Sequence, residues 1–355
     1  MKKSLTLCMA ALLVFGMFGC AADSTPEETT AATEVVETTV PATTEKYVPA
    51  EGELFLSVSE ITFSLVGESE DIYLGTAPRE AITWGSEDES VATFQDGVLT
   101  ATGVGSTTVY AQLEDSRMEI PVSCLAQTQE ELDALDEDIL RSPKRMPPVL
   151  ENPPLEFFDD AAIIGDSISY ILFQHEAKMG DLGNPLFLAR GGTSLNGLVL
   201  YYKNIYYQGH EMKIEDAVEK SGVKKVFVML GQNDLGYRTI EDTMTSWDLL
   251  LGRILEKSPD VEVYIQSCLH EWKELYESNE KNEKINLYNE ELIRYCEENG
   301  YHYVDIQQYI VDHTGRMASV YSMDLSIHLN ETGSKAWMQA LNAYAYTQLM
   351  GGTTE

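Results

Sequence analysis

From about residue 158 to the end of the chain, short apolar stretches alternate with longer amphipathic ones. The apolar stretches have the length of buried strands and occupy residues 161–164, 186–189, 225–230, 261–266 and 301–304. The amphipathic stretches have helical length and include residues 168–177, 214–221, 243–257, 281–298 and 331–349. This alternation predicts a parallel sheet with helices on both faces, so residues 158–350 are expected to form an α/β domain. Ligands of such open sheets bind at the carboxyl ends of the strands.

A serine follows the first of these strands, in the segment Ile163-Ile164-Gly165-Asp166-Ser167. At a strand-to-helix turn the hydroxyl is presented at the carboxyl edge of the sheet. Amides at the start of the next helix favour negative charge beside it. The position therefore suits a nucleophile, although a Gly-Asp-Ser tripeptide by itself is more commonly an ordinary turn with a helix cap.

An asparagine follows the strand expected at 225–230, in the segment Leu230-Gly231-Gln232-Asn233-Asp234. Its side-chain amide at the sheet edge would be a neutral donor to an oxyanion, and one such donor typically lowers a barrier by about 3 kcal/mol. Taken alone, the segment is more commonly an Asn-Asp turn.

A histidine stands just before the last expected helix, in Met323-Asp324-Leu325-Ser326-Ile327-His328. A loop at this place can fold over the same sheet edge. An imidazole, with its ordinary pKa of about 6.5, is suited to accept a serine proton. A lone histidine in a loop is more often a surface residue, so the three segments gain weight only in combination.

In this order and strand context, the three segments resemble the sequence blocks of the SGNH (GDSL-like) hydrolase family, over residues 159–350. The resemblance implies a flavodoxin-like three-layer αβα sandwich with esterase activity. It implies that Ser167 is the nucleophile and that His328 is its base. The oxyanion hole would consist of the Ser167 amide, a glycine amide from a second block and the Asn233 side chain. Such a mechanism requires neither a metal nor an organic cofactor.

Two details depart from the family pattern. The second block must lie within residues 189–194, where Gly192 is the preferred oxyanion-hole glycine and Gly191 the alternative. The family usually has an Asp three residues before the His, but that position is Leu325 here, and Asp324 stands four residues before. Either the loop bulges so that Asp324 orients the imidazole, or a backbone carbonyl does so.

Residues 51–125 contain short segments of alternating polarity, separated by Gly, Asp and Ser. The pattern predicts a small, all-β antiparallel sandwich. The segments around Trp84 and at 96–109 resemble a bacterial Ig-like group 2 domain, which implies a spacer or adhesive module whose glycines form turns at positive φ. Residues 126–157 are expected to be a charged, partly helical connector that ends at two Pro-Pro pairs.

Residues 1–20 have the layout of a secretory signal peptide, with a cationic start and an apolar run too short to span a bilayer permanently. The end of this segment, Met17-Phe18-Gly19-Cys20, resembles a bacterial lipobox, which implies lipidation at Cys20. An ordinary signal peptide that happens to contain a Cys is the alternative. Residues 21–50 are almost entirely Thr, Glu, Ala, Val and Pro, a composition that predicts a disordered tether.

The formal net charge of −34 disfavours nucleic acids and anionic lipid surfaces as partners, so the N-terminal lipid is the only expected membrane contact. Three further cysteines are too widely spaced for a disulfide framework or a metal pattern, and at most one bridge is expected among Cys124, Cys268 and Cys296. The histidines show no metal-ligand spacing. His270 follows a predicted strand and could contact substrate, but a structural histidine is the more common case.

Together these features favour a lipid-anchored, extracytoplasmic serine esterase at the bacterial cell surface, and acetyl groups on a polysaccharide are the leading substrate hypothesis. The alternatives are a glycan O-acyltransferase that uses the same acyl-enzyme, and a non-catalytic adhesion or glycan-binding protein. The pairs Tyr201-Tyr202 and Tyr206-Tyr207 could stack against sugars or simply pack in the fold. The sequence carries no signal of oligomeric state.

Overall fold

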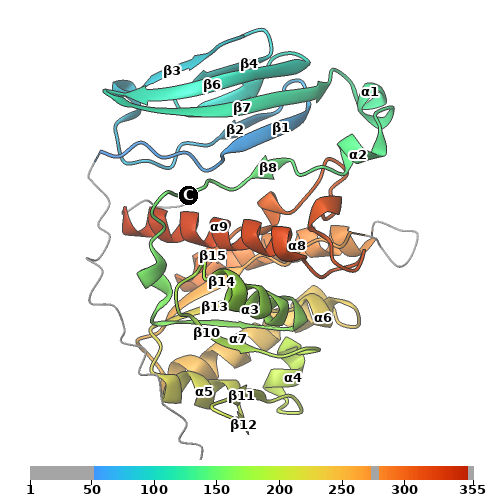
Figure 1. Ribbon diagram of the computed structural model, residues 1–355. Coiled ribbons are helices and arrows are strands. Elements are labelled where there is room, and N and C mark those ends of the chain that lie inside the picture. Colours follow the sequence, from blue (N-terminus) through green and yellow to red (C-terminus); the bar gives the residue numbers. More distant parts are fainter. Residues whose placement is uncertain (1–51, 273–279, 351–355) are drawn as a thin grey trace, which may run out of the picture. The chain divides into compact units, whose positions relative to one another are not determined.

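The computed structural model describes residues 52–272 and 280–350, and its C-terminal part is built on a five-stranded sheet (Figure 1). Its strands are β9 (Ala161–Gly165), β10 (Leu186–Ala189), β13 (Lys225–Met229), β14 (Glu262–Gln266) and β15 (His302–Val304). Neighbouring strands all pair in parallel, in the order β10-β9-β13-β14-β15. The predicted parallel sheet is therefore confirmed.

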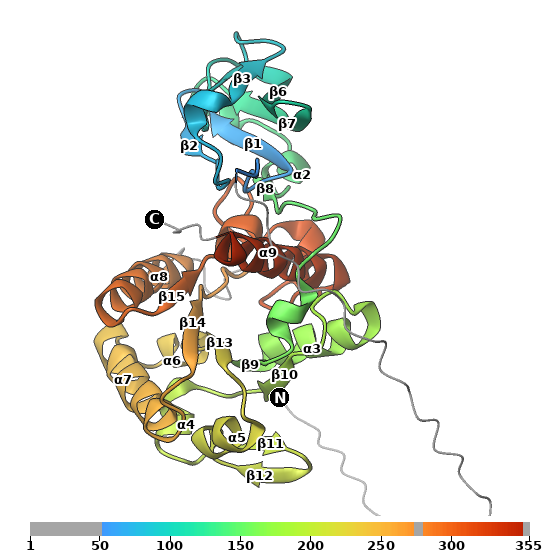
Figure 2. The same cartoon turned by 90° about the vertical axis from the view of Figure 1, so that its left-hand side faces the viewer.

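Helices cover both faces of this sheet, as Figure 2 shows. They are α3 (Ser167–Met179), α4 (Leu195–Val199), α5 (Ile214–Ser221), α6 (Gln232–Leu235), α7 (Ile240–Lys257), α8 (Glu280–Asn299) and α9 (Glu331–Leu349). Successive strand residues point to opposite faces. Ile163 packs with Trp337 of α9 and residues of α3, whereas Ile164 packs with Trp247 of α7 and residues of α5 and α8. Both tryptophans are fully buried, so the result is the expected three-layer α/β arrangement.

A small hairpin lies between α4 and α5 and consists of β11 (Ile205–Tyr207) and β12 (His210–Met212). The connection of the last strand to α9 contains two 3-10 turns, η3 (Gln307–Tyr309) and η4 (Ser319–Tyr321). Asn330 caps the N-terminus of α9, since its side chain accepts a hydrogen bond from the Gly333 amide at 3.0 Å. This cap sets the end of the loop that carries His328.

The N-terminal part of the described chain is an all-β unit with two sheets, ordered β3-β6-β7-β1-β8 and β2-β5-β4, in which β8 (Arg145–Met146) comes from the connector. Its strands are β1 (Glu60–Leu65), β2 (Ser69–Asp71), β3 (Thr83–Ser86), β4 (Ala92–Gln95), β5 (Val98–Ala101), β6 (Gly105–Leu113) and β7 (Ser116–Ala126). Trp84 packs edge-on against Tyr73 and Phe94 in its core. Gly97 lies at positive φ in the turn between β4 and β5, as expected. The group 2 Ig-like assignment stays a prediction.

One pairing in this unit differs from the expected antiparallel arrangement. Strand β1 pairs with β7 in parallel, with Ile61 opposite Val122. The two strands are separated by most of the unit, so no hairpin dictates their relative direction, and only directly linked strands have to be antiparallel.

The connector is partly helical, as expected, with α1 (Gln129–Asp133) and α2 (Glu137–Leu140), and η2 (Leu155–Phe158) follows its prolines. It also contains β8 (Arg145–Met146), which adds an antiparallel edge to β1. The expected boundary at residue 125 is thus not the end of the all-β unit, because a short piece of the connector completes its sheet.

The expected signal peptide, lipobox Cys20 and tether fall within residues 1–50, which lie outside the described residues. In the described part, no helix has the length and apolar character needed to cross a membrane. Cys124, Cys268 and Cys296 are buried and free, so the one possible bridge among them is not formed.

Candidate active site

Ser167 is the first residue of α3 and is separated from β9 only by Asp166, at the carboxyl edge of the sheet. The Asp166 side chain caps the helix by accepting a hydrogen bond from the Ile168 amide at 2.9 Å. The residue before it must be small, because a Cβ on Gly165 would come within 2.0 Å of the Ser169 hydroxyl and 3.0 Å of the Met229 carbonyl. The Gly-Asp-Ser sequence therefore fixes a tight strand-to-helix turn that presents the Ser167 hydroxyl at the sheet edge.

His328 reaches this hydroxyl from a point 161 residues further along the chain, with a distance of 3.0 Å between its Nε2 and the Ser167 Oγ. The other ring nitrogen, Nδ1, lies 2.5 Å from the Asp324 Oδ2. Because an ionised carboxylate can only accept, Nδ1 carries the proton in a neutral ring and Nε2 is left as an acceptor. The Ser167 hydroxyl then donates to Nε2, which is the arrangement needed for a base to remove its proton.

The one-residue difference from the family spacing is absorbed at Leu325, whose φ of 54° lies in the left-handed region. The turn lets Asp324 reach back over the loop. Its Oδ1 accepts hydrogen bonds from the amides of Ser326 at 3.0 Å and His328 at 3.3 Å, while its Oδ2 contacts the imidazole. Of the two possibilities left open by the sequence, the structure has the bulged loop with Asp324 on the imidazole.

The environment of Asp324 keeps its carboxylate ionised. Partial burial acts to raise its pKa, but the hydrogen bonds from the His328 side chain and the amides of His328 and Ser326 outweigh this and lower the pKa below its ordinary value. A carboxylate that stays ionised at neutral pH can both fix the imidazole tautomer and stabilise an imidazolium.

Asn233 lies on α6, at the carboxyl end of β13, and its side chain points toward the same edge. Its amide nitrogen donates to the Asp166 Oδ2 at 3.0 Å and to the Thr193 carbonyl at 2.8 Å. Both amide hydrogens are thus already bound to protein acceptors, which the sequence did not indicate. Donation to an oxyanion therefore requires that one of these two bonds be shared or released.

Asp166 is buried beside the nucleophile and has its carboxylate between the Ile168 amide and the Asn233 side chain. Burial raises its pKa to about 6, although the Ile168 amide and the nearby His328 act in the opposite direction. Sequence reasoning assigned this residue no role. Its position makes it the fixed acceptor that orients Asn233.

The second-block loop contributes Gly191 and Gly192. Gly192 has a φ of 67°, a conformation that residues with a Cβ rarely adopt, whereas Gly191 has an ordinary φ and open space where a Cβ would be. The backbone therefore requires glycine at 192, whereas the choice between the Gly192 and Gly191 amides as oxyanion donors stays a prediction. The neighbouring Thr193 carbonyl holds Asn233, so this loop and α6 meet beside Ser167.

A buried carboxylate joins the same two segments. The Asp234 side chain accepts hydrogen bonds from the amides of Leu195 at 2.9 Å and Asn196 at 3.0 Å, at the start of α4. Burial raises its pKa even though these bonds lower it. The Asn-Asp pair is therefore more than a turn, because Asp234 fixes the second-block loop while Asn233 binds Asp166, the residue before the nucleophile.

Two tyrosines form what we call the tyrosine rim: Tyr202, in the segment after α4, and Tyr237, in the turn after α6. Both hydroxyls lie 3.3 Å from the Ser194 Oγ, and the side chains are 57% and 61% exposed. Tyr237 was not anticipated, because nothing near it in sequence marks it. Tyr201 is instead structural, since its hydroxyl donates to Glu215 and cations from Lys213 and Arg253 lie over its ring.

The other candidate residues are structural. His270 is buried, with its Nδ1 2.5 Å from the Gly315 carbonyl and its Nε2 2.7 Å from the Asn286 Oδ1, in accord with the more common case. His175 pairs with the buried Ser334 at 2.7 Å. Within residues 52–272 and 280–350, no group of three or more His, Cys, Asp or Glu side chains is arranged to hold a metal ion.

Comparison with known protein families finds a match that covers the residues of this site. Residues 163–336 match the GDSL-like Lipase/Acylhydrolase family, a span that contains Ser167, Asn233 and His328. No curated protein matches the chain. The chain is also similar to several solved structures. A putative platelet activating factor from Streptococcus pneumoniae is 20% identical, with a TM-score of 0.43 over 53% of this chain and 84% of that one.

Two further solved structures are similar at lower identity. An acetylxylan esterase from Geobacillus stearothermophilus is 15% identical, with a TM-score of 0.37 over 54% of this chain and 94% of that one. The C-terminal catalytic domain of a peptidoglycan O-acetyltransferase from Streptococcus pneumoniae is 14% identical, with a TM-score of 0.39 over 55% of this chain and 96% of that one.

Proposed function

From the premise that residues 163–336 form a GDSL-like lipase/acylhydrolase domain and that the protein is a carboxylic ester hydrolase, we propose that it cleaves small acyl esters through an acyl-enzyme on Ser167. The observation that carries the proposal is the continuous chain of contacts from Asp324 through His328 to the Ser167 hydroxyl, at 2.5 and 3.0 Å. Such a chain activates a hydroxyl that is otherwise a weak nucleophile.

The proposed reaction has two matched halves. His328 Nε2 takes the proton of Ser167 as the Oγ forms a bond to the ester carbonyl carbon, and Asp324 stabilises the imidazolium that results. The carbon–oxygen bond to the alcohol then breaks, and His328 returns the proton to the leaving alkoxide. A water attacks the acyl-enzyme by the same route, which releases the acid and restores Ser167. His328 performs every proton transfer, so the steps use no metal or organic cofactor.

The negative charge that develops on the carbonyl oxygen would be stabilised by the amides of Ser167 and Gly192, or Gly191, and by Asn233. Asn233 is held in place by Asp166 and the Thr193 carbonyl. We propose that its bond to Thr193 or Asp166 is shared with the oxyanion in the transition state, because preorganised donors cost no reorganisation as the charge forms.

We propose a polysaccharide carrying small acyl groups, acetyl first among them, as the substrate. The tyrosine rim supports this choice. Both hydroxyls are hydrogen-bonded to Ser194 beside the second-block loop, and both side chains are more than half exposed. Rings held in this way suit the apolar face of a sugar. The signal and lipobox expected in residues 1–20 support a location outside the membrane, tethered by lipid at Cys20.

The test compares the wild-type chain with Ser167→Ala, using p-nitrophenyl acetate and acetylated glycans, with free acetate and new sugar esters measured in the products. The proposal predicts acetate release that is lost in Ser167→Ala. Retention of wild-type activity in the variant would contradict the mechanism. Formation of a new sugar ester in place of free acetate would reassign the protein as an O-acyltransferase that uses the same site.

A further inference from the structure

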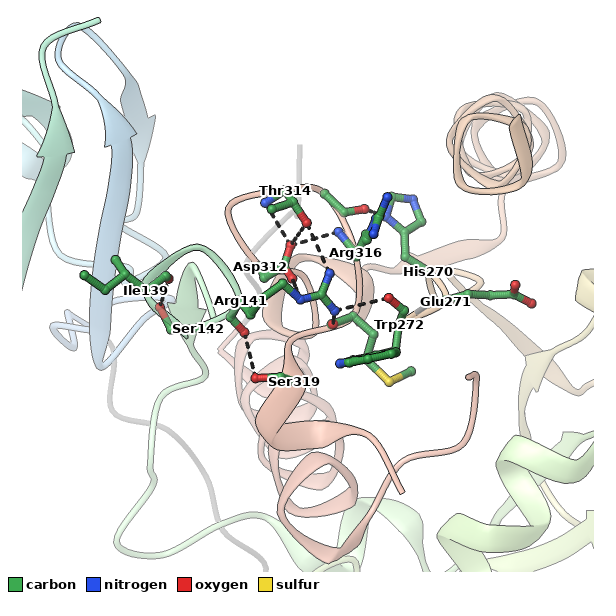
Figure 3. A network of polar contacts seen from close by, with 12 residues as sticks. Ile139, Arg141, Ser142, His270, Glu271, Trp272, Asp312, Thr314, Arg316 and Ser319 are labelled. Atoms are coloured by element: carbon green, nitrogen blue, oxygen red, sulfur yellow. Dashed lines mark hydrogen bonds and ion pairs between the residues drawn. The ribbon is translucent and has the colours of Figure 1, made fainter. Parts of the chain in front are cut away.

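An arginine from outside the matched domain is buried against it. Arg141 directly follows α2 in the connector and has only 6% of its surface exposed. Its Nε forms an ion pair with the Asp312 Oδ2 at 3.0 Å, and Asp312 is fully buried. Figure 3 shows the guanidinium at the centre of a polar network, within which Asp312 also accepts hydrogen bonds from Thr314 and Arg316.

The Nη1 of Arg141 donates to the Thr314 hydroxyl at 3.3 Å, and its Nη2 binds main-chain carbonyls from two separate segments. Its Nη2 donates to the carbonyls of Trp272 at 3.1 Å and Met317 at 2.9 Å, and its charge lies 5.1 Å from the centre of the Trp272 ring. A planar fork of donors can hold several carbonyls at fixed separations, which a single ammonium cannot do. Arg141 therefore sets the position of Trp272 relative to the segment around Met317.

Trp272 is the direct link to the candidate active site. Its amide donates to the Ser326 carbonyl at 2.7 Å, and the Ser326 amide in turn donates to the Asp324 Oδ1 at 3.0 Å. Ser326 stands between Asp324 and His328 in the chain. The Arg141 side chain thus supports the middle of the loop of residues 323–330, which we call the histidine loop, through one intervening residue.

A second route reaches the end of the same loop. The Arg141 carbonyl accepts a hydrogen bond from the Ser319 amide at 3.0 Å, at the start of η4. At the end of η4, the Tyr321 carbonyl accepts from the Asn330 amide at 2.8 Å, just after His328. The side chain and the main chain of one connector residue therefore support the loop at two points.

External support matters here because the loop is locally strained at Leu325, whose left-handed conformation persists only if its surroundings hold it. We propose that Arg141 is a positioning residue for the hydrolytic reaction, which holds the loop of residues 323–330 so that His328 stays within reach of Ser167. The inference rests on the proposed function of the Ser167–His328 pair. It makes the connector part of the catalytic apparatus, although it precedes the matched family domain.

The test uses the full chain with Arg141→Lys and Arg141→Met, and Arg145→Met as the matched control. Arg145 is also a connector arginine, and it binds Glu70 and Gln308 but no residue of the histidine loop. We expect kcat for p-nitrophenyl acetate to fall roughly 10- to 100-fold in Arg141→Met, with KM little changed, because small displacements of a catalytic group have effects of this size. Arg141→Lys should restore only part of the lost kcat. Arg145→Met should keep the kcat of the wild type.

Amide hydrogen exchange separates positioning from general stability. The proposal predicts faster exchange in residues 322–330 of the Arg141 variants, with unchanged exchange in the sheet core. Uniformly faster exchange, or an equal loss of kcat in Arg145→Met, would overturn it. If Arg141→Met does not fold, the pair Arg141→Met with Asp312→Leu removes both buried charges while the carbonyls of Trp272 and Met317 still lose their donor, and it is held to the same expectations.

The two proposals fail in distinguishable ways. Full activity in every folded Arg141 variant, with Ser167→Ala inactive, would overturn the positioning role and leave the proposed function intact. Undiminished activity in Ser167→Ala would overturn the proposed function itself.

Discussion

Asp324 shows how one side chain can set the chemistry of another. Its Oδ2 faces the His328 Nδ1, while its Oδ1 is bound by two loop amides. The side chain cannot rotate without losing those amides. The carboxylate therefore fixes which nitrogen of the imidazole is free to take the serine proton.

Replacement of Asp324 by Asn should lower kcat by roughly 10²- to 10⁴-fold. The Asn oxygen can keep the loop amides, but its NH₂ group would then face Nδ1 and place the imidazole proton on the nitrogen next to Ser167. Steady-state hydrolysis of p-nitrophenyl acetate measures the effect, with the exposed Asp260→Asn as a matched control. A loss of less than about threefold would show that Asp324 does not orient the base.

Asp166 makes stability depend on pH near the nucleophile. Its pKa in the folded chain, about 6, is above the ordinary value of 3.8 because the group is buried. The folded state therefore holds this proton more tightly than the unfolded state between these two values. The contribution to stability is complete below about pH 4 and is lost as pH rises through 6.

Urea unfolding of wild type and Asp166→Asn between pH 4 and 7 tests this sign. The free energy of unfolding of the wild type should fall relative to that of the variant as pH rises through the window. Taking the difference between the two proteins cancels most of the contribution of neighbours such as Asp234, whose pKa is also raised by burial. A difference that is flat or rises with pH would contradict the assignment.

At the scale of elements, the histidine loop has one more residue between its Asp and its His than the family pattern has, because Asp324 stands four residues before His328. Leu325 is 58% exposed and makes the left-handed turn that lets Asp324 reach His328 from four positions away. The turn needs a particular backbone conformation and no particular side chain at this position. Glycine adopts that conformation without a Cβ clash, whereas a β-branched residue is the least suited to it.

Leu325→Gly should keep kcat within about twofold of wild type, because glycine adopts the left-handed turn readily. Its free energy of unfolding should also change little, because relief of the left-handed strain roughly offsets the greater freedom of glycine in the unfolded chain. Leu325→Val should destabilise the loop by about 1 kcal/mol or more and reduce kcat. Kinetics and thermal unfolding of the two variants check this order. A Val variant as active as the Gly variant would mean that the turn is not required.

The elements that sequence periodicity predicted are those long enough to show it. All five strands of the parallel sheet and the long helices α7, α8 and α9 were expected, whereas β8, β11 and β12 were not. The three missed strands have only two or three residues, too few positions for an alternating pattern. Strand β15 is equally short, but its place in the alternation of strands and helices indicated it. The parallel pairing of β1 with β7 depends on contacts between distant segments, which local pattern does not specify.

The residues of the candidate site also fall into two groups, those marked by their local sequence and those whose role depends on distant partners. Ser167, Asn233 and His328 were indicated because each follows a strand or precedes a helix in a marked segment. The roles of Asp166 and Tyr237 were missed, since each depends on a partner far away in sequence. Arg141 was missed for the same reason, because its partners lie 131 and more residues further along the chain.

At the scale of the whole molecule, the described domains follow a long N-terminal segment whose composition predicts a signal and a tether. We propose that lipid at Cys20 holds the enzyme at the membrane and that residues 21–50 let it reach polymeric substrates. The anchor and the catalytic machinery are independent in this account, so one can be removed without the other.

Cys20→Ala should release the protein from the membrane fraction while its specific activity toward p-nitrophenyl acetate stays within about twofold of wild type. Fractionation of cells that express the two forms, with metabolic labelling by a radioactive fatty acid, measures both lipidation and location. Retention of the label in Cys20→Ala would refute the proposed anchor.

In the proposed mechanism, Ser167 becomes covalently acylated because His328 activates it. The most direct measurement is labelling by a fluorophosphonate, in which the Ser167 Oγ displaces fluoride from phosphorus and the adduct is located by peptide mass spectrometry. We expect one adduct per chain, on Ser167, formed at least 100-fold more slowly in His328→Ala, as loss of a positioned base implies. Labelling at another residue, or an equal rate in His328→Ala, would contradict it.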